Sequence, residues 1–530
     1  MNDCEKCKQE LAEDTSLCAN CEPQEEEAIE NPETETSVPE EADASAETPT
    51  SEEPETSTKA SAPVETEVSV HAETRKKLAI PPPAAVDDML IFRVAATIFA
   101  ASFFFLVIMR FEEINILDER GHVLGLLLTV LFLAAGLIAA TLCPPPRDQS
   151  EPVTDSFIRL AFALVMIAGL MAIRGSLLYY VSGDYANHLA HWIRAMEPLS
   201  VREALSVNVG NYNMPYMYIL LLISRIDFPG MFLIKFASMV FDVVLAYFVM
   251  KLVSLRTENV NFRLAAFLGA LAIPTVIING SMWAQCDVIY SSLAIGALYF
   301  AMAGKSKHAY IFMGLAFSFK MQAVFVLPMF LIFLLKGKIR LQDIWLFPVT
   351  FSVTLLPATI AGMPIGEAFS AYFNQFEYYS WLNMNATSIW RLVGWIDHDQ
   401  FITAGLFVAG TATVALLYFI YLHRDRITKT ADYVYMAYLF AAMLPFLLPK
   451  MHDRFLFMAD VLSLVVFAYN KKRWYVPLVT IYASYNTYVW FLMGQVTLID
   501  YVYVSIALGV VILIVLKDLV ERLYLQKEVY

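Results

Sequence analysis

An acid stands at an unusual place, directly after a long apolar run. Asp184 lies in the segment Gly-Asp-Tyr at 183–185, and His191 and Trp192 follow a few residues later. A carboxylate at such a position could accept a proton from a hydroxyl group as that hydroxyl attacks an electrophilic carbon. Taken alone, Asp184 is explained more simply as a solvated loop acid, so its chemistry depends on what else lies nearby.

A second segment places an indole, an amide and an acid where one apolar run ends and the next begins. These residues are Trp283, Gln285 and Asp287, and together they could line a binding site. Asn279 or Asp287 could equally cap a helix, while Trp283 could anchor the chain at a membrane interface. Both interpretations remain open from the sequence.

Cations in two further segments indicate an anionic ligand. Lys320 and Gln322 interrupt an apolar stretch, where a lysine can neutralise phosphate oxygens as a point charge, although it could also snorkel to the interface. The later segment 449–454 contains His452 and Arg454. A guanidinium binds phosphate through two parallel N–H groups, and an imidazole can donate to the same oxygens.

The elements that must position these residues are apolar helices. Of the 530 residues, 58% are hydrophobic and 17% are charged, whereas soluble domains have about 45–50% apolar and about 25% charged residues. This composition excludes a soluble enzyme, a fibrous protein and a nucleic-acid-binding domain. It predicts an all-α polytopic membrane protein with about 14 crossings. The predicted spans are 89–109, 122–142, 156–180, 231–250, 264–279, 286–303, 308–319, 323–335, 344–362, 401–422, 433–448, 455–469, 474–493 and 499–516.

Basic loops predict the orientation of these spans. Lys and Arg cluster in alternate loops, which the positive-inside rule places in the cytosol together with both chain termini. The short runs on either side of Lys320 then form a hairpin, and the run 212–224 is predicted to be an interfacial helix. All four segments described above fall on the extracytoplasmic face, which is where we expect the active site.

Four cysteines near the start predict a structural zinc site. They form the pattern C-x2-C-x10-C-x2-C, whose thiolates can surround Zn²⁺ tetrahedrally and fold a segment too short for its own core. Disulfides or free thiols are the alternatives, but a cytosolic location favours zinc. The segment is similar to the small zinc ribbons of bacterial membrane proteins. The predicted ligands are Cys4, Cys7, Cys18 and Cys21.

The net charge of −14 belongs to the amino-terminal region. Residues 1–77 hold 22 Asp and Glu against 6 Lys and Arg, so this charge carries no information about a membrane-bound substrate. We predict a zinc ribbon at 1–25, a disordered acidic linker at 26–85, a transmembrane hairpin at 86–150 and a main membrane domain at 151–530.

The simplest ligand for acids and cations on one membrane face is an anion attached to a lipid, such as a polyprenyl-phosphate sugar. The motifs resemble those of the GT-C superfamily of membrane glycosyltransferases, especially the dolichyl-phosphate-glucose-dependent glucosyltransferases and their bacterial relatives. The family's Gly-Asp-Tyr and His-Trp match 183–185 and 191–192, and its Tyr-Lys-Gln-Met matches 319–322 loosely. Its Gly-His-Phe-Gln-Tyr-Asn aligns with 281–287, and its late His-Glu-Lys matches 452–454 with charges kept. The resemblance covers roughly 156–516.

The resemblance implies a role for each matched residue. Asp184 would be the general base on the acceptor, and Lys320, His452 and Arg454 would hold the donor phosphate. The reaction would be inverting, with no catalytic metal, and the acceptor would be a glycolipid, a polysaccharide or a protein. The residues implied to line the sugar or acceptor site are Tyr185, His191, Trp192, Trp283, Gln285, Asp287, Gln322 and Asp453.

Two other functions fit the same sequence. A transporter or flippase for lipid-linked sugars would use the same cations without needing a base at Asp184. A membrane scaffold could leave the work to the zinc ribbon. No feature of the chain indicates nucleic-acid binding.

Overall fold

The computed structural model describes residues 88–112, 120–143, 153–369, 372, 381–393, 399–494, 497 and 499–529. These residues belong to one compact unit, Pro81–Tyr530. The predicted zinc ribbon, with its four cysteines, and the acidic linker lie outside the described residues and stay predictions.

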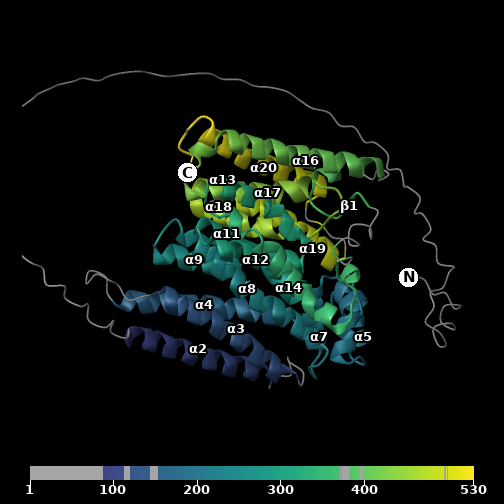
Figure 1. Cartoon of the computed structure of the whole chain (residues 1–530). Coiled ribbons are helices and arrows are strands. Elements are labelled where there is room, and N and C mark those ends of the chain that lie inside the picture. Colours follow the sequence, from purple (N-terminus) through teal and green to yellow (C-terminus); the bar gives the residue numbers. More distant parts are fainter. Residues whose placement is uncertain are drawn as a thin grey trace, which may run out of the picture. The chain divides into compact units, whose positions relative to one another are not determined.

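The described chain is mostly helical (Figure 1). The first half contains α2 (Asp88–Glu112), α3 (Gly121–Leu142), α4 (Val153–Ser176), the π-helix η1 (Tyr185–Leu189), α5 (Ala190–Met196), α6 (Val201–Ser206), α7 (Met214–Ile223), α8 (Gly230–Ser254), α9 (Val260–Leu271), α10 (Pro274–Ile277), the π-helix η2 (Ile278–Met282) and α11 (Asp287–Met302). The second half contains α12 (Ser306–Phe319), the 3₁₀ helix η3 (Met321–Val326), α13 (Pro328–Leu335), α14 (Leu346–Ala361), β1 (Asn383–Met384), α16 (Asp399–Leu422), α17 (Thr430–Leu447), β2 (Met451–His452), α18 (Phe457–Tyr469), α19 (Tyr475–Leu492) and α20 (Tyr501–Leu523).

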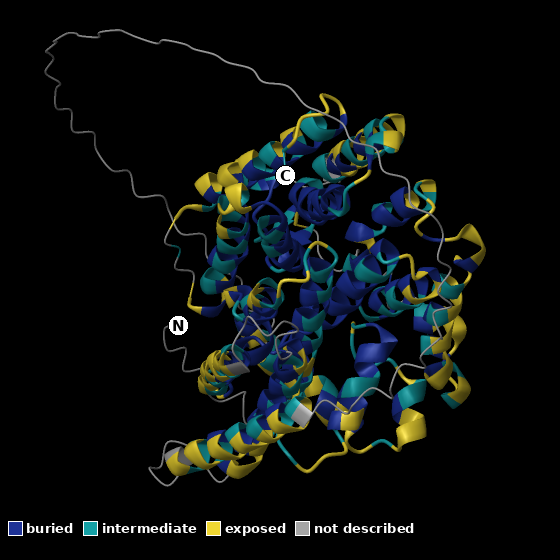
Figure 2. Ribbon diagram, turned by 90° about the vertical axis from the view of Figure 1, so that its left-hand side faces the viewer, coloured by how far each residue is buried: buried dark blue, intermediate teal, exposed yellow. Residues whose placement is uncertain are grey.

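The helices stack in layers, with α2–α4 on one side, α16 and α20 on the other, and α8, α11, α17 and α18 between them (Figure 1). Among the described residues, eight helices are long and apolar enough to cross a membrane, or nine if one bent pair counts as a single span. A helix that is apolar all round must be covered by protein or by lipid. Protein covers α17, whose apolar window is 78% buried, whereas the windows of α2 and α16 are 22% buried. The outer helices therefore expose apolar side chains of the kind that faces lipid. Exposed residues are yellow in Figure 2.

Two predicted elements take a more particular form in the structure. The predicted span 264–279 is broken: α9 and the α10–η2 segment meet at an angle of 49°, just before Pro274. The two sides of the predicted hairpin around Lys320 both contact α11, but α12 also packs against α14 whereas α13 also packs against α16 and α17. Lys320 itself is extended, with φ −156° and ψ 133°. The chain changes neighbours at this lysine.

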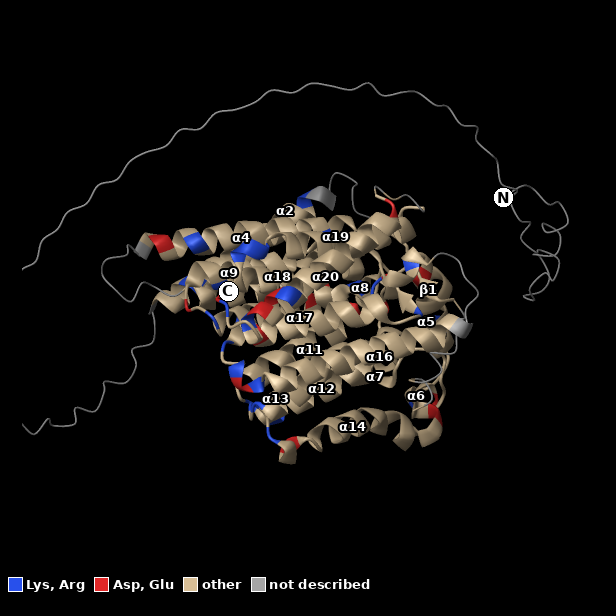
Figure 3. Cartoon of the chain, turned by 90° about the horizontal axis from the view of Figure 1, so that it is seen from above, with Lys and Arg blue, Asp and Glu red and all other residues tan. Residues whose placement is uncertain are grey.

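The loops lie at two ends of the helix stack, and contacts at each end show which loops lie together. At one end, Lys336 donates to the carbonyl of Arg424 at 2.8 Å, and Arg473 pairs with Asp518 near the carboxyl end of the chain. Figure 3 shows Lys and Arg gathered at this end, beside the C-terminus. At the other end, β1 pairs in parallel with β2. The residues predicted to do chemistry lie at this second end.

Candidate functional site

Asp184 sits at the entrance to η1, where it is held by three donors from distant parts of the chain. Its Oδ2 accepts from Trp283 Nε1 at 2.9 Å and from Gln285 Nε2 at 2.5 Å. Arg454 contacts the same oxygen at 3.3 Å. None of these contacts reaches Oδ1, and the side chain is 23% exposed. Asp184 therefore has one oxygen fixed and one available to another molecule.

Trp283 and Gln285 reach Asp184 because the chain turns sharply between them. Ala284 has φ 65°, a left-handed conformation that residues with a side chain rarely adopt. Ser182 donates to the carbonyl of Trp283 at 2.6 Å, and Ser238 donates to the carbonyl of Gln285 at 2.7 Å. The two serines hold the turn from both sides, so both side chains stay directed at one carboxylate.

Asp287 ties the two cations of the site together. It is fully buried at the start of α11, where the helix dipole favours a negative charge. Lys320 pairs with its Oδ1, Asn279 donates to its Oδ2 at 3.0 Å, and Arg454 Nε lies 3.5 Å from the same oxygen. Asp287 thus positions Lys320 and Arg454 side by side.

The segment after α17 is fixed by the short parallel pair of β1 and β2. Asn383 aligns with Met451 and Met384 with His452. Asn385 and Lys450, which flank the pair, both have positive φ. Strained backbone of this kind persists only where the surroundings enforce it, as at functional sites.

Burial sets the charge states in this segment. Burial, together with the neighbouring Arg454 and Lys320, lowers the pKa of His452 to about 3 although Asp287 opposes the change, so the neutral imidazole is favoured. Burial also raises the pKa of Asp453 to about 7, although Arg454 opposes that change. Arg454 lies 3.5 Å from Asp453 and stacks over the Trp283 ring at 5.2 Å. Its guanidinium is therefore shared among three carboxylates and an indole.

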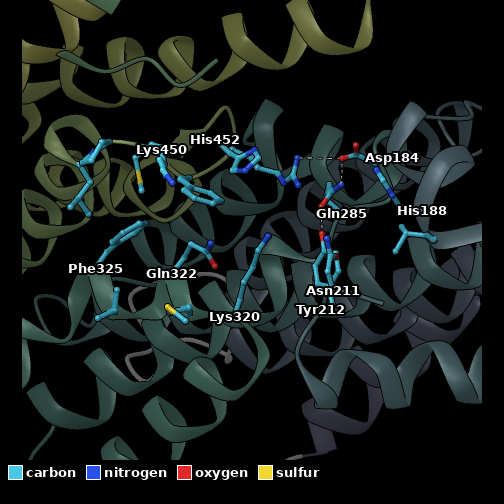
Figure 4. A pocket seen from close by; sticks show the side chains of 18 of the residues that line it. Asp184, His188, Asn211, Tyr212, Gln285, Lys320, Gln322, Phe325, Lys450 and His452 are labelled. Carbon is cyan, nitrogen blue, oxygen red and sulfur yellow. Dashed lines mark hydrogen bonds and ion pairs between the residues drawn. The ribbon is translucent and has the colours of Figure 1, made fainter. Parts of the chain in front are cut away.

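Asp184, Gln285, Lys320, His452 and Arg454 border one cavity of about 590 Å³. Figure 4 shows Phe325 and Lys450 towards one end of the cavity, His452 and Lys320 in the middle, and Asp184 at the other end. The apolar residues of the lining include Met321, Val324, Phe325, Ile402, Leu406, Leu448, Met451 and Phe455. The polar end is lined by Asp184, His188, Trp192, Asn211, Tyr212 and Gln285. The cavity suits a molecule that is apolar at one end, anionic in the middle and hydroxylated at the other.

The structure brings most of the predicted site residues together, but it divides them into two groups. Those that line the cavity are Asp184, Trp192, Gln285, Lys320, Gln322, His452 and Arg454. Trp283, Asp287 and Asp453 are buried behind the lining and support it. Tyr185 and His191 are not lining residues, and His191 instead faces Arg194 at 3.4 Å.

The sequence did not single out His188, which also lines the cavity. His188 could have been predicted from its spacing of four residues from Asp184, because this spacing puts the two side chains on one face of a helix. No group of three or more His, Cys, Asp or Glu side chains suited to a metal ion occurs within the described ranges. The sequence does contain an Asp-x-Asp segment at 397–399, of which 397 and 398 fall outside those ranges.

Comparison of the chain with protein-family models gives no match, and comparison with curated proteins gives none either. The site therefore has to be interpreted from its own geometry.

Proposed function

We propose that the protein is a membrane glycosyltransferase that moves a sugar from a polyprenyl-phosphate donor to an acceptor hydroxyl. One observation carries the proposal: a single cavity presents an apolar zone, then cations, then a carboxylate held by three donors. A polyprenyl-phosphate sugar has the same order of parts, with a lipid tail, a phosphate and a polyol. The cavity volume lies within the range of about 300–1,000 Å³ that is typical of ligand sites.

Each step of the reaction has a residue suited to it. Asp184 Oδ1 takes the proton of the acceptor hydroxyl as that oxygen forms a bond to the anomeric carbon. The bond from that carbon to the phosphate oxygen breaks, and polyprenyl phosphate leaves with the bonding electrons. Lys320 and Arg454 stabilise the charge that grows on the leaving phosphate. Neutral His452 acts as a hydrogen-bond donor to it rather than as a cation.

The wider proposal includes the fold and its orientation. We infer a GT-C-type helix bundle of about 14 crossings, in which α11, α12, α13, α18 and α19 add short crossings to the longer spans. The basic loops lie at the end of the stack away from the cavity, which supports a cytosolic C-terminus and an extracytoplasmic site in the plasma membrane. The same proposal includes the zinc ribbon and a pocket that binds the sugar. It also includes an acceptor that is a glycolipid, a polysaccharide or a protein.

The test uses the purified full-length protein in liposomes with a panel of polyprenyl-phosphate sugars. Release of polyprenyl phosphate should require a suitable donor and acceptor. Asp184→Asn should lower the rate by at least about 100-fold, the lower end of what a general base contributes, and should leave binding of polyprenyl phosphate intact. Asp500→Asn is the matched control, because Asp500 only caps α20 through the Val502 amide. Transfer that survives Asp184→Asn would contradict the assigned base.

A transporter or flippase for lipid-linked sugars is the second candidate, and the broken helix favours it. Interrupted helices such as α9 with α10–η2 occur at the substrate sites of transporters. In liposomes that hold a labelled lipid-linked sugar, a flippase would move the label across the bilayer without releasing polyprenyl phosphate. It would also keep that activity in Asp184→Asn.

A further inference from the structure

Lys235 is a lysine buried in α8 without an acidic partner. Its side chain is fully buried, and its Nζ donates to the carbonyls of Leu177 at 3.2 Å, Leu178 at 2.7 Å and Tyr180 at 2.7 Å. An ammonium group has three N–H donors, and each has a carbonyl here. No carboxylate pairs with it among the described residues. A buried cation of this kind is costly inside a membrane domain and usually has a functional reason.

The three carbonyls follow the carboxyl end of α4, which stops at Ser176. The last carbonyls of a helix lack partners within it and carry the negative end of the helix dipole. Lys235 therefore satisfies the carbonyls of the connection at 177–180, which leads directly to Asp184. Tyr180 is fixed a second time, by its hydroxyl at 2.5 Å from the carbonyl of Leu492.

The remaining part of the connection is held by Ser182. Its hydroxyl donates to the carbonyl of Trp283 at 2.6 Å and accepts from the amide of Tyr185 at 3.2 Å. Lys235 fixes the start of the connection and Ser182 fixes its end. Between them the backbone has little freedom, so the place of the Asp184 carboxylate beside Trp283 and Gln285 depends on both.

Holding α4 against α8 does not require Lys235. Arg174 on α4 pairs with Asp242 on α8 at 3.0 Å, with both side chains fully buried. That pair already joins the two helices deeper in the bundle. The distinct effect of Lys235 falls on the chain beyond the helix end.

We propose that Lys235 is a positioning residue that sets the path of the 177–184 connection and thereby the geometry of Asp184. The part of this inference that concerns catalysis rests on the proposed function, whereas the part that concerns the connection does not. Displacement of a catalytic group by about 1 Å can slow a reaction by about 100-fold. Lys235 thus affects the rate without touching the substrate.

The test compares Lys235→Met with Lys251→Met, a change near the other end of the same helix where Lys251 lies over the Tyr247 ring. Both are made in the full-length protein in detergent or liposomes. Hydrogen exchange of the amides at 181–189 should rise by at least about tenfold in Lys235→Met and stay unchanged in Lys251→Met. Transfer kcat should fall by about 10- to 100-fold, while KM for the donor lipid changes little.

The outcomes separate this inference from the proposed function. Unchanged exchange at 181–189 would overturn the inference even if the protein is a glycosyltransferase. Raised exchange in a protein that transfers no sugar would support the positioning of the connection and reject the proposed function. If Lys235→Met does not fold, Lys235→Gln replaces it, because its amide cannot reach all three carbonyls. Unchanged exchange and kcat in that variant would also overturn the inference. Lys235→Arg, which keeps the positive charge, should leave exchange and kcat closer to their wild-type values than Lys235→Gln does.

Discussion

The indole N–H of Trp283 offers a selective way to disturb the candidate base. Trp283→Phe removes one of the three donors to Asp184 Oδ2 and leaves Gln285 and Arg454 in place. The new ring can still stack on Phe491, whose centroid lies 4.7 Å from that of Trp283. A hydrogen bond to a charged group contributes about 1.5–3 kcal/mol. If that whole contribution serves the transition state, kcat/KM for transfer should fall by roughly 10- to 150-fold.

The assay is release of polyprenyl phosphate over a range of donor concentrations that extends below KM, with thermal unfolding measured in parallel. Tyr438→Phe is the control, because it also removes a buried donor, the hydroxyl that lies 2.8 Å from Thr480 Oγ1, at a place outside the cavity lining. Both variants should lose some stability, but only Trp283→Phe should lose transfer. A folded Trp283→Phe protein whose kcat/KM stays within about threefold of wild type would refute the reasoning that Trp283 orients the base.

Two further predictions do not depend on the proposed function. Arg174→Met leaves Asp242 buried without its cation and should lower the free energy of unfolding by about 3–5 kcal/mol. The double variant Arg174→Met with Asp242→Leu should recover most of that loss. Equal unfolding temperatures for wild type and the single variant would reject the prediction. Burial raises the pKa of Asp453 to about 7, above the value in an unfolded chain, so the native state holds a proton that the unfolded state releases. The resulting stability is complete below about pH 4, falls as pH rises and is lost once pH passes about 7. Asp453→Asn should therefore flatten the dependence of the unfolding temperature on pH between about 4 and 7, and an unchanged pH dependence would contradict the assignment.

The positions of the long helices could be predicted because apolar runs end at basic loops. The predicted span 401–422 corresponds to α16, Asp399–Leu422, and the predicted interfacial run 212–224 corresponds to α7, Met214–Ile223. Hydropathy carries no information about direction within a run, so the 49° bend before Pro274 was missed. The pairing of β1 with β2 was also missed, since two residues in each strand are too few to give an alternating pattern.

Residue types and order could suggest which groups meet, but not how each one is used. Trp283 was predicted to line the sugar site, whereas its N–H holds Asp184 from behind the cavity wall. The direction of that side chain follows from the positive φ of Ala284 and from two serine contacts, none of which leaves a pattern in the sequence. Lys235 was not singled out from the sequence, because its three carbonyl partners depend on the fold.

The charge balance of the cavity bears on which ligand it can hold. The cations of the site already have partners, since Lys320 pairs with Asp287 and Arg454 contacts Asp184, Asp287 and Asp453. An incoming phosphate would exchange one anionic partner for another, and such exchanges yield little net binding energy. Burial of apolar surface, at about 25 cal/mol per Å², must then supply most of the affinity. A small free phosphate would bury little of the apolar lining that includes Phe325 and Leu406, so we expect the site to prefer an anion that carries its own lipid chain.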